Sequence, residues 1–273
     1  MSELRFLRRN LRILVLNPNS STIMTEGMAN AIRQMSLPDA DVSQKSVEIY
    51  TYTAPPHSAP GSIDDQDGID RSTQAVLDDP KIEEELESDK YDGVLVACFS
   101  VHCLVSKLTR YRHLAVTGIF EASILTSLSL MAAPDNAGKW GIVTTGKWWE
   151  DHLSHGVKNF LGQQKDGVNN KFAGVFSSGL TAGDFHTVPP EKVREKLKEA
   201  TRKLLNEGQV SVVLMGCGGM AGLEEIIRST AIEEYGKADG NLVYIVDGVK
   251  AGVMQLEQMI RSKKIFRTLP EYK

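Results

Sequence analysis

Gly93-Val-Leu-Val-Ala-Cys98-Phe-Ser100 and Val212-Val-Leu-Met-Gly-Cys217-Gly-Gly219 are the two stretches that decide the fold of this chain. Each begins as an apolar run typical of a buried β-strand, and each ends at a cysteine that starts a predicted turn. The chain has only three cysteines in 273 residues, so two of them in matching contexts indicate a duplicated fold. Such a duplication would bring both thiols to one cleft.

The composition is that of a soluble globular protein. The chain is 41% hydrophobic and 24% charged, which is enough apolar sequence for the core of one large domain or two smaller ones. Its formal net charge of −4 gives no basic excess, so we expect no nucleic-acid partner. No apolar stretch approaches the roughly 20 residues of a membrane span, so we expect no membrane partner.

The cysteine count predicts a reducing compartment. Three cysteines are an odd number and do not form a disulfide framework. The basic segment at residues 5–9 is followed by an apolar run that is too short for a secretion signal. We therefore expect a cytoplasmic protein.

Short β-branched runs alternate with longer helical patterns, which is the signature of βαβ units and a parallel sheet. Strands are predicted at residues 11–16, 47–52, 94–97 and 114–119, and again at 139–144, 172–176, 210–215 and 242–246. Helices are predicted at residues 24–35, 69–77, 81–86, 102–108, 148–160, 191–207, 223–234 and 250–260. The fold class is therefore α/β, with two pseudo-equivalent domains in which each cysteine follows the third strand.

The domain boundaries follow from this repeat. Residues 1–122 together with 248–273 are expected to form the first domain, because the final helix of a duplicated fold often packs back on the first half. Residues 123–247 are expected to form the second domain. The chain is expected to cross between them around residues 118–133.

Ligands of open parallel sheets bind beyond the carboxyl ends of the strands. Four segments of this sequence fall at such ends: Asn17-Pro18-Asn19, Cys98, Thr144-Thr145 and Cys217. If the two domains face each other there, all four segments line one cleft. We take this cleft as the candidate active site.

Two thiols in one cleft can carry out acid–base chemistry at carbon. A free thiol has a pKa near 8.5 and a helix N-terminus lowers that value, so we expect both cysteines to ionise readily. One thiolate could remove a proton next to a carbonyl while the other thiol returns one from the opposite face, with sulfurs roughly 6–7 Å apart. The N–H groups of Gly218 and Gly219 could hold the developing oxyanion. This scheme needs no metal and no organic cofactor.

The alternative for each cysteine is burial in the core, because free cysteine is among the most buried residue types. The matched contexts favour a functional role for Cys98 and Cys217, whereas Cys103 lies inside a helical pattern and is expected to be structural. His102 is expected to be a packed or solvated histidine. No set of His, Cys and carboxylate residues has the spacing of a structural zinc site.

Four segments carry a family resemblance: Ile13-Leu-Val-Leu-Asn-Pro-Asn-Ser-Ser-Thr22, Pro60-Gly-Ser-Ile-Asp64, Val94-Leu-Val-Ala-Cys-Phe-Ser100 and Leu214-Met-Gly-Cys-Gly-Gly-Met220. They resemble the aspartate/glutamate/hydantoin racemase superfamily. More narrowly, they are similar to its hydantoin racemase branch, with the allantoin racemases and the fungal Dcg1-like members. The match spans residues 11–260, and the order and spacing of the segments make it specific.

The resemblance implies two four-stranded parallel sheets flanked by helices, with cofactor-independent racemisation in the cleft between them. It identifies Cys98 and Cys217 with the two catalytic positions. It implies a 5-substituted hydantoin or an allantoin-like ureide as substrate, and hence a place in purine catabolism and nitrogen metabolism. The turns Cys98-Phe99-Ser100 and Gly216-Cys217-Gly218 depart from the Cys-Asn-Thr and Gly-Cys-Thr turns usual in amino-acid racemases. The resemblance also suggests a homo-oligomer.

Other residues are predicted to hold the substrate. The amides of Asn17 and Asn19 and the hydroxyl of Ser100 could donate to a carbonyl or ureide, although a turn or a helix cap explains them equally well. The full predicted set of substrate-binding residues is Asn17, Pro18, Asn19, Ser62, Ile63, Phe99, Ser100, Thr144, Thr145, Gly218 and Gly219.

Two other functions stay open at this point. The same cysteines could serve a decarboxylase or a cis–trans isomerase of a small carboxylate. Such substrates need cations, and only Lys107 and Lys147 lie near the four strand-end segments. A non-catalytic ureide-binding protein would instead bind its ligand without hydrogen exchange at carbon. In each case the expected partner is a small molecule.

Overall fold

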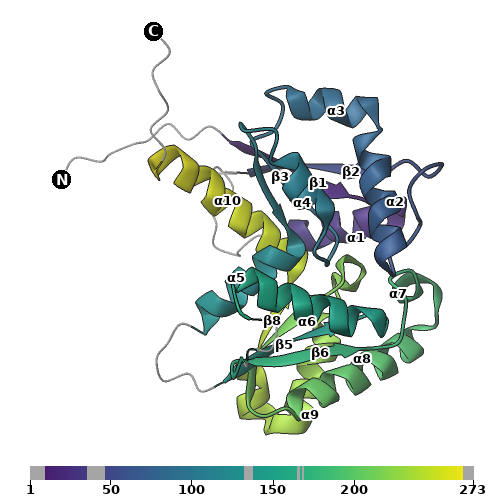
Figure 1. Ribbon diagram of the computed structural model, residues 1–273. Helices are drawn as coiled ribbons and strands as arrows, with labels where there is room; N and C mark the ends of the chain where they lie inside the picture. Colours follow the sequence, from purple (N-terminus) through teal and green to yellow (C-terminus); the bar gives the residue numbers. More distant parts are fainter. Residues whose placement is uncertain (1–9, 36–46, 132–137, 165–166, 168, 267–273) are drawn as a thin grey trace.

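The computed structural model of this protein describes residues 10–35, 47–131, 138–164, 167 and 169–266. The basic segment at residues 5–9 lies outside this part of the chain. The described residues form two four-stranded sheets covered by helices, one half above the other in Figure 1. The predicted α/β class, with a parallel sheet in each half, is confirmed.

Both sheets are parallel and share one strand order. The first has the order β2-β1-β3-β4, with β1 at Leu11–Asn17, β2 at Val47–Thr53, β3 at Gly93–Val96 and β4 at Ala115–Gly118. The second has the order β6-β5-β7-β8, with β5 at Lys139–Thr144, β6 at Phe172–Ser177, β7 at Val210–Gly216 and β8 at Tyr244–Asp247. Strand β3 therefore occupies the place in the first sheet that β7 occupies in the second. This equivalence puts Cys98 and Cys217 beyond corresponding strands.

The predicted strands agree with the observed ones to within two residues at every end. The agreement is close because the inner strands β1, β3, β5 and β7 are buried almost throughout. Parallel strands that are covered on both faces have nearly continuous apolar sequences, which are easy to locate.

Helices cover the faces of each sheet. Those of the first half are α1 at Thr22–Arg33, α2 at Gln66–Leu77, α3 at Pro80–Glu87 and α4 at Cys103–Leu108. Those of the second are α6 at Trp148–Phe160, α7 at Asp184–Thr187, α8 at Pro190–Leu205 and α9 at Glu224–Leu242. Side-chain caps begin α1, α2 and α3, at Ser21, Asp65 and Asp79. The short α7 and the 3-10 turn η1 at Gly218–Met220 were not predicted, since neither is long enough to show a helical period.

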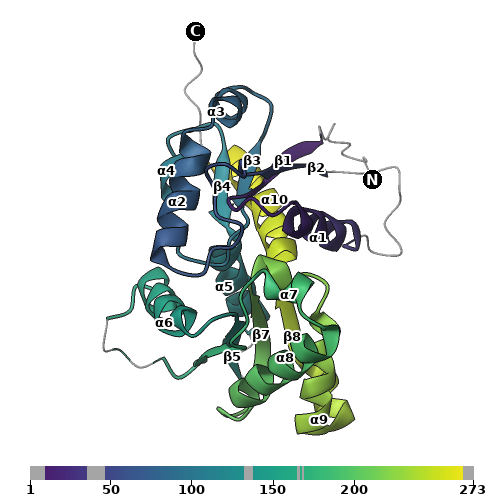
Figure 2. The same ribbon diagram turned by 90° about the vertical axis from the view of Figure 1, so that its right-hand side faces the viewer.

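Two further helices connect the halves, because each follows one sheet along the chain and packs on the other. Helix α5, at Ile119–Leu130, follows the first sheet but packs on β7 and β8 of the second. Helix α10, at Gly248–Phe266, follows the second sheet but packs on β1, β3 and β4 of the first, as Figure 2 shows. The two helices also pack against each other. The sequence predicted only a crossing segment where α5 lies, because this helix is apolar on most sides and lacks an amphipathic period. The exact domain boundaries stay a prediction.

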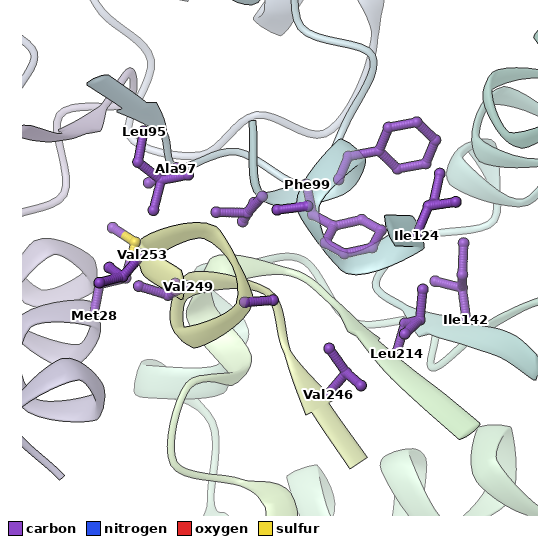
Figure 3. Packing of buried hydrophobic residues seen from close by; sticks show 14 of the residues in the cluster. Met28, Leu95, Ala97, Phe99, Ile124, Ile142, Leu214, Val246, Val249 and Val253 are labelled. Atoms are coloured by element: carbon purple, nitrogen blue, oxygen red, sulfur yellow. The ribbon is translucent and has the colours of Figure 1, made fainter. Parts of the chain in front are cut away.

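The packing of α5 and α10 across the two halves produces one continuous apolar core. Figure 3 shows Leu95 and Ala97 of the first half, Ile142 and Leu214 of the second, and Val249 of α10 in a single cluster. The cluster therefore couples the position of one sheet to that of the other. Within the described ranges, none of the helices is both long and apolar enough to cross a bilayer.

Gly252 provides a test of the packing of α10 on the first sheet. A β-carbon at this position would lie 2.6 Å from Cδ2 of the fully buried Leu95. We predict that Gly252→Ala lowers the free energy of unfolding by about 1–3 kcal/mol, as overpacking does. Urea denaturation followed by circular dichroism measures this change.

Gly27 of α1 is the matched control, since a β-carbon there would meet nothing within 4 Å. Gly27→Ala should stabilise the protein by about 0.5–1 kcal/mol through helix propensity alone. Stabilisation by both substitutions would show that α10 does not pack closely on β3.

Candidate active site

A pocket lies where the carboxyl ends of the two sheets meet. Each of the four predicted strand-end segments contributes one lining residue: Asn19, Cys98, Thr145 and Cys217. The full lining consists of Asn19, Met24, Met28, Ile63, Ala97, Cys98, Phe99, Thr145, Trp149, Ala182, Gly216, Cys217, Gly218 and Gly219. The expected shared cleft is therefore present, and both cysteines face it as free thiols.

The two cysteine turns approach each other closely at Gly218. A β-carbon on this residue would lie 3.3 Å from the carbonyl oxygen of Ala97, which precedes Cys98. It would lie equally close to the sulfur of Met28 on α1. The glycine after Cys217 is thus the point where the second half meets the first beside the site. A β-carbon there would require these neighbouring atoms to shift by a few tenths of an ångström.

Cys98 is held by its own turn. Its sulfur accepts a hydrogen bond from the Ser100 hydroxyl at 3.3 Å. Burial raises the pKa of the Cys98 thiol to about 12; the Ser100 hydrogen bond opposes the shift, and the charges of Cys217, Asp64 and Glu121 add to it. Phe99 is buried beside it and packs edge-on against Phe120, with ring centroids 5.6 Å apart.

Cys217 is held in a similar way by a backbone group. Its sulfur accepts a hydrogen bond from the N–H of Gly219 at 3.3 Å, which makes Cys217 the cap of η1. Burial raises the pKa of this thiol to about 12 as well; the Gly219 hydrogen bond opposes the shift and the charge of Asp64 adds to it. The Gly219 amide thus donates to the Cys217 sulfur, although we expected it to bind a substrate oxyanion.

The expectation that helix N-termini lower both thiol pKa values is wrong. Helix α4 begins only at Cys103, five residues beyond Cys98, and the turn after Cys217 is a 3-10 segment of three residues. Neither sulfur therefore lies at the end of a long helix, where the dipole effect is strongest. Burial between the two halves dominates instead, and it favours the neutral thiol.

The two asparagines of the Asn17-Pro18-Asn19 turn have different roles. Asn17 is fully buried, and its amide nitrogen donates to Asn19 Oδ1 at 3.0 Å and to Thr25 Oγ1 at 3.0 Å. Asn19 lines the pocket, with its own amide nitrogen 3.3 Å from the sulfur of Met24. Asn17 thus positions Asn19, and only Asn19 can reach a ligand. Asn17 and Pro18 do not line the pocket as predicted, because the turn folds them behind it.

Three other predicted residues also lie behind the pocket wall. Ser100 is fully buried and donates to Cys98, so its hydroxyl is not available to a substrate. The hydroxyl of Thr144 donates to the Gly216 carbonyl at 2.9 Å and ties the end of β5 to that of β7. Ser62 has a buried hydroxyl oxygen with no hydrogen-bond partner among the described residues. Their neighbours Phe99, Thr145 and Ile63 line the pocket instead.

The sequence did not point to several lining residues. Met24 and Met28 lie one turn apart on α1, Trp149 is on α6, and Ala182 is on the loop before α7. Their side chains reach the pocket because α1, α6 and the loop before α7 lie beside the strand ends. A methionine pair four residues apart, directly after the Asn-Pro-Asn turn, was the one available signal.

Two carboxylates outside the lining also affect the site. Glu121, in the first turn of α5, has a buried Oε2 with no hydrogen-bond partner among the described residues. Burial raises its pKa to about 7, while its own backbone amide and that of Gly118 oppose the shift. Asp64 follows the lining residue Ile63 and raises the pKa of both thiols through its charge. In the described chain, no lysine, arginine or histidine lines the pocket.

His102 is a packed histidine, one of the two roles expected for it. Its Nδ1 accepts from the Leu104 N–H at 3.3 Å and caps α4, and its Nε2 lies 3.1 Å from the Ser72 hydroxyl. Burial lowers the pKa of His102 to about 4, although the charge of Asp70 opposes the shift. The ring is therefore neutral at physiological pH and serves the start of α4. In the described chain no three His, Cys, Asp or Glu side chains come together as a metal site.

His102 should make the protein sensitive to acid. The unfolded chain takes up a proton near pH 6.5, but the folded protein does so only near pH 4, so this contribution to stability is present above pH 6.5 and is lost between pH 6.5 and 4. We predict that wild type loses about 3 kcal/mol more than His102→Asn between pH 7 and pH 4, as measured by urea denaturation at each pH. His57→Asn, at an exposed histidine, is the control and should match wild type. An equal loss in wild type and His102→Asn would contradict the buried neutral ring.

The thiol pKa values predict how the cysteines react with iodoacetamide. Only the thiolate reacts, so the alkylation rates of Cys98 and Cys217 should rise about tenfold per pH unit from pH 7 to 10 without levelling off. In urea the same thiols should level off above about pH 9. Peptide mass spectrometry separates them from Cys103. A plateau below pH 9 in the folded protein would show that burial does not control ionisation.

The fold and the site together define a class of protein: two equivalent α/β halves with one thiol from each in a shared pocket. The model of the Asp/Glu/hydantoin racemase family matches residues 13–256. Protein DCG1 of Saccharomyces cerevisiae is 29% identical over 92% of this chain and 96% of its own length. A hydantoin racemase of a Pseudomonas species is 26% identical over 96% of this chain and 91% of its own. An allantoin racemase from Klebsiella pneumoniae shares the fold, with a TM-score of 0.67, 24% identity, and coverage of 92% and 88%.

This chain belongs to the Asp/Glu/hydantoin racemase family and is an enzyme of the racemase class. The resemblance inferred from the four segments is confirmed, including its fungal Dcg1-like branch.

Proposed function

We propose that this enzyme is a cofactor-independent racemase of a neutral ring, either a 5-substituted hydantoin or an allantoin-like ureide. Cys98 and Cys217 would be its two acid–base groups. The observation that carries this proposal is that the two thiols reach one pocket from equivalent strands of opposite halves. The names of the related hydantoin and allantoin racemases support the substrate class.

The proposed reaction is a proton exchange at one carbon. The sulfur of one cysteine, as thiolate, takes the proton from the carbon next to the carbonyl, and the C–H electron pair moves into the carbonyl to give an enolate. The thiol of the second cysteine then donates its proton to the opposite face of that carbon, and the carbonyl re-forms. The substrate leaves inverted, and the second cysteine is now the thiolate. The roles are exchanged when the other enantiomer binds.

Buried thiols suit this proton transfer. With a pKa of about 12, each thiol of the free protein is ionised in only about one molecule in 10⁵ at pH 7. The thiolate that does form is a stronger base than an ordinary cysteine thiolate, which helps it to remove a weakly acidic C–H proton. Hydrogen bonds from Ser100 and from the Gly219 amide favour the thiolate on each side.

The charge of the pocket favours a neutral substrate. A diacid would need cations, and the lining of the pocket among the described residues contains none. Lys147, one of the two lysines that we considered, forms an ion pair with Glu150 at the start of α6. The decarboxylase and isomerase alternatives are therefore less well supported. The non-catalytic alternative would leave the paired thiols without a role.

Isotope exchange tests the proposed reaction. Single enantiomers of allantoin and of several 5-substituted hydantoins are incubated with the enzyme in heavy water. We predict that the optical rotation of at least one decays to zero and that its inverted product carries deuterium at the stereocentre. If none of these compounds exchanges its proton, the substrate class is wrong.

Substitution of each cysteine tests the mechanism. Cys98→Ser and Cys217→Ser should each lower racemisation by about 10²–10⁴-fold, the usual contribution of a general acid or base. Cys103→Ser is the matched control and should keep full activity, because Cys103 begins α4 and does not line the pocket. Full activity in either of the first two variants would exclude the two-thiol mechanism.

A cytoplasmic location and a homo-oligomeric state are part of the proposal. The first rests on the cysteine count and the second on the family resemblance.

A further inference from the structure

The apolar part of the pocket lining belongs to the core of the protein. Among the described residues, the polar groups on lining side chains are those of Asn19, Thr145 and the two cysteines, with the indole N–H of Trp149. The larger apolar lining residues are buried members of the cluster that joins the two halves, each no more than 5% exposed: Met24, Met28, Ile63, Phe99 and Trp149. A ligand in the pocket therefore exchanges water for the surface of the hydrophobic core.

Hydrogen-bond acceptors are scarce in this lining. Asn19 Oδ1 already accepts two hydrogen bonds within its own turn. The Gly216 carbonyl accepts from the Thr144 hydroxyl, and the sulfurs of the two cysteines accept from groups of their own turns. The Thr145 hydroxyl is then the main side-chain acceptor for a ligand, and the N–H groups of a hydantoin ring would use it. A substituent with further N–H groups would be left without an acceptor among these side chains.

Two of the apolar side chains come from equivalent helices of the two halves. Met28 is on α1, which follows β1, and Trp149 is on α6, which follows β5; these strands hold the same place in the two sheets. The Met28 sulfur would lie 3.3 Å from a β-carbon on Gly218, so this side chain reaches the turn of the second cysteine. Trp149 is held by edge-on contacts with Trp148 and His152, with ring centroids 4.8 and 5.5 Å apart. The pocket is thus bounded by a methionine and a tryptophan from opposite halves.

We propose that Met28 and Trp149 bound a subsite for an apolar substituent at the stereocentre, so that the substrate is a hydantoin with an aliphatic or aromatic 5-substituent rather than allantoin. Allantoin carries a ureido group at this carbon, and its N–H groups would lose water here without gaining acceptors. An apolar group of the same size gains free energy by leaving water. This inference rests on the proposed function and names its substrate class.

A pair of unreactive ligands tests the subsite by calorimetry. The substituents of 5-isobutyl-5-methylhydantoin and 5-carbamoylmethyl-5-methylhydantoin have the same shape, but one is apolar and the other is an amide. Neither ligand has a proton at the stereocentre. Wild type should bind the isobutyl compound at least about tenfold more tightly. Equal affinities, tighter binding of the amide, or no binding of the isobutyl compound would overturn the proposal.

Met28→Gln tests the methionine side of the subsite. It should reduce the preference for the isobutyl compound to about threefold or less, because the glutamine carbonyl supplies the missing acceptor. Met35→Gln is the matched control and should keep the wild-type preference, since Met35 packs on the same core cluster without lining the pocket.

Trp149→Phe tests the other side. The smaller ring should improve the binding of 5-methyl-5-(2-phenylethyl)hydantoin at least about threefold relative to the isobutyl compound. Trp148→Phe is the control, because Trp148 is exposed and does not line the pocket. If Met28→Gln and Trp149→Phe both keep the wild-type preferences, these residues do not form the subsite. The wild-type comparison needs no variant, so it judges the proposal even if a variant does not fold.

The subsite and the reaction fail separately. If 5-isobutylhydantoin binds but exchanges no proton in heavy water, the proposed reaction is wrong and the subsite stands. If allantoin is racemised with a higher kcat/KM than 5-isobutylhydantoin, the reaction stands and the apolar subsite is wrong.

Discussion

The packing of α5 and α10 across the two halves is the constraint on which the site depends. Each helix follows one sheet and packs on the other, and both contribute to a single apolar core. Because that core is continuous, the end of β3 is fixed relative to the end of β7. The close approach of Gly218 to the Ala97 carbonyl follows from this placement. Without it the two cysteines would belong to separate clefts.

The same packing sets the chemistry of the thiols. It removes both sulfurs from water and so raises their pKa values to about 12, and the charges of Asp64 and Glu121 add to the shift at Cys98. The described residues that line the pocket include no cation to offset these charges. A site of this kind disfavours every additional negative charge. It keeps the resting thiols neutral, makes the rare thiolate strongly basic, and suits a substrate that carries no charge of its own. Burial therefore links the acid–base step to the choice of substrate.

The strands and the two cysteine turns could be predicted from the sequence, because their patterns are local. The buried strands are continuous apolar runs, and the turns at Cys98 and Cys217 follow them directly. The missed features depend on how distant segments pack. Helix α5 has no amphipathic period since both halves cover it, and Met28 reaches the pocket only through the placement of α1. The predicted direction of the thiol pKa shift was wrong for the same reason, because burial between the two halves leaves no local pattern in the sequence.

The most direct test of the account is a crystal structure with 5,5-dimethylhydantoin, whose ring carbon carries no proton to remove. We predict that this carbon lies between the sulfurs of Cys98 and Cys217, about 3–3.5 Å from each, with the two sulfurs on opposite faces of the ring. A ligand that lies outside the pocket would contradict the two-thiol site. A ligand with both sulfurs on the same face of its ring would contradict it equally.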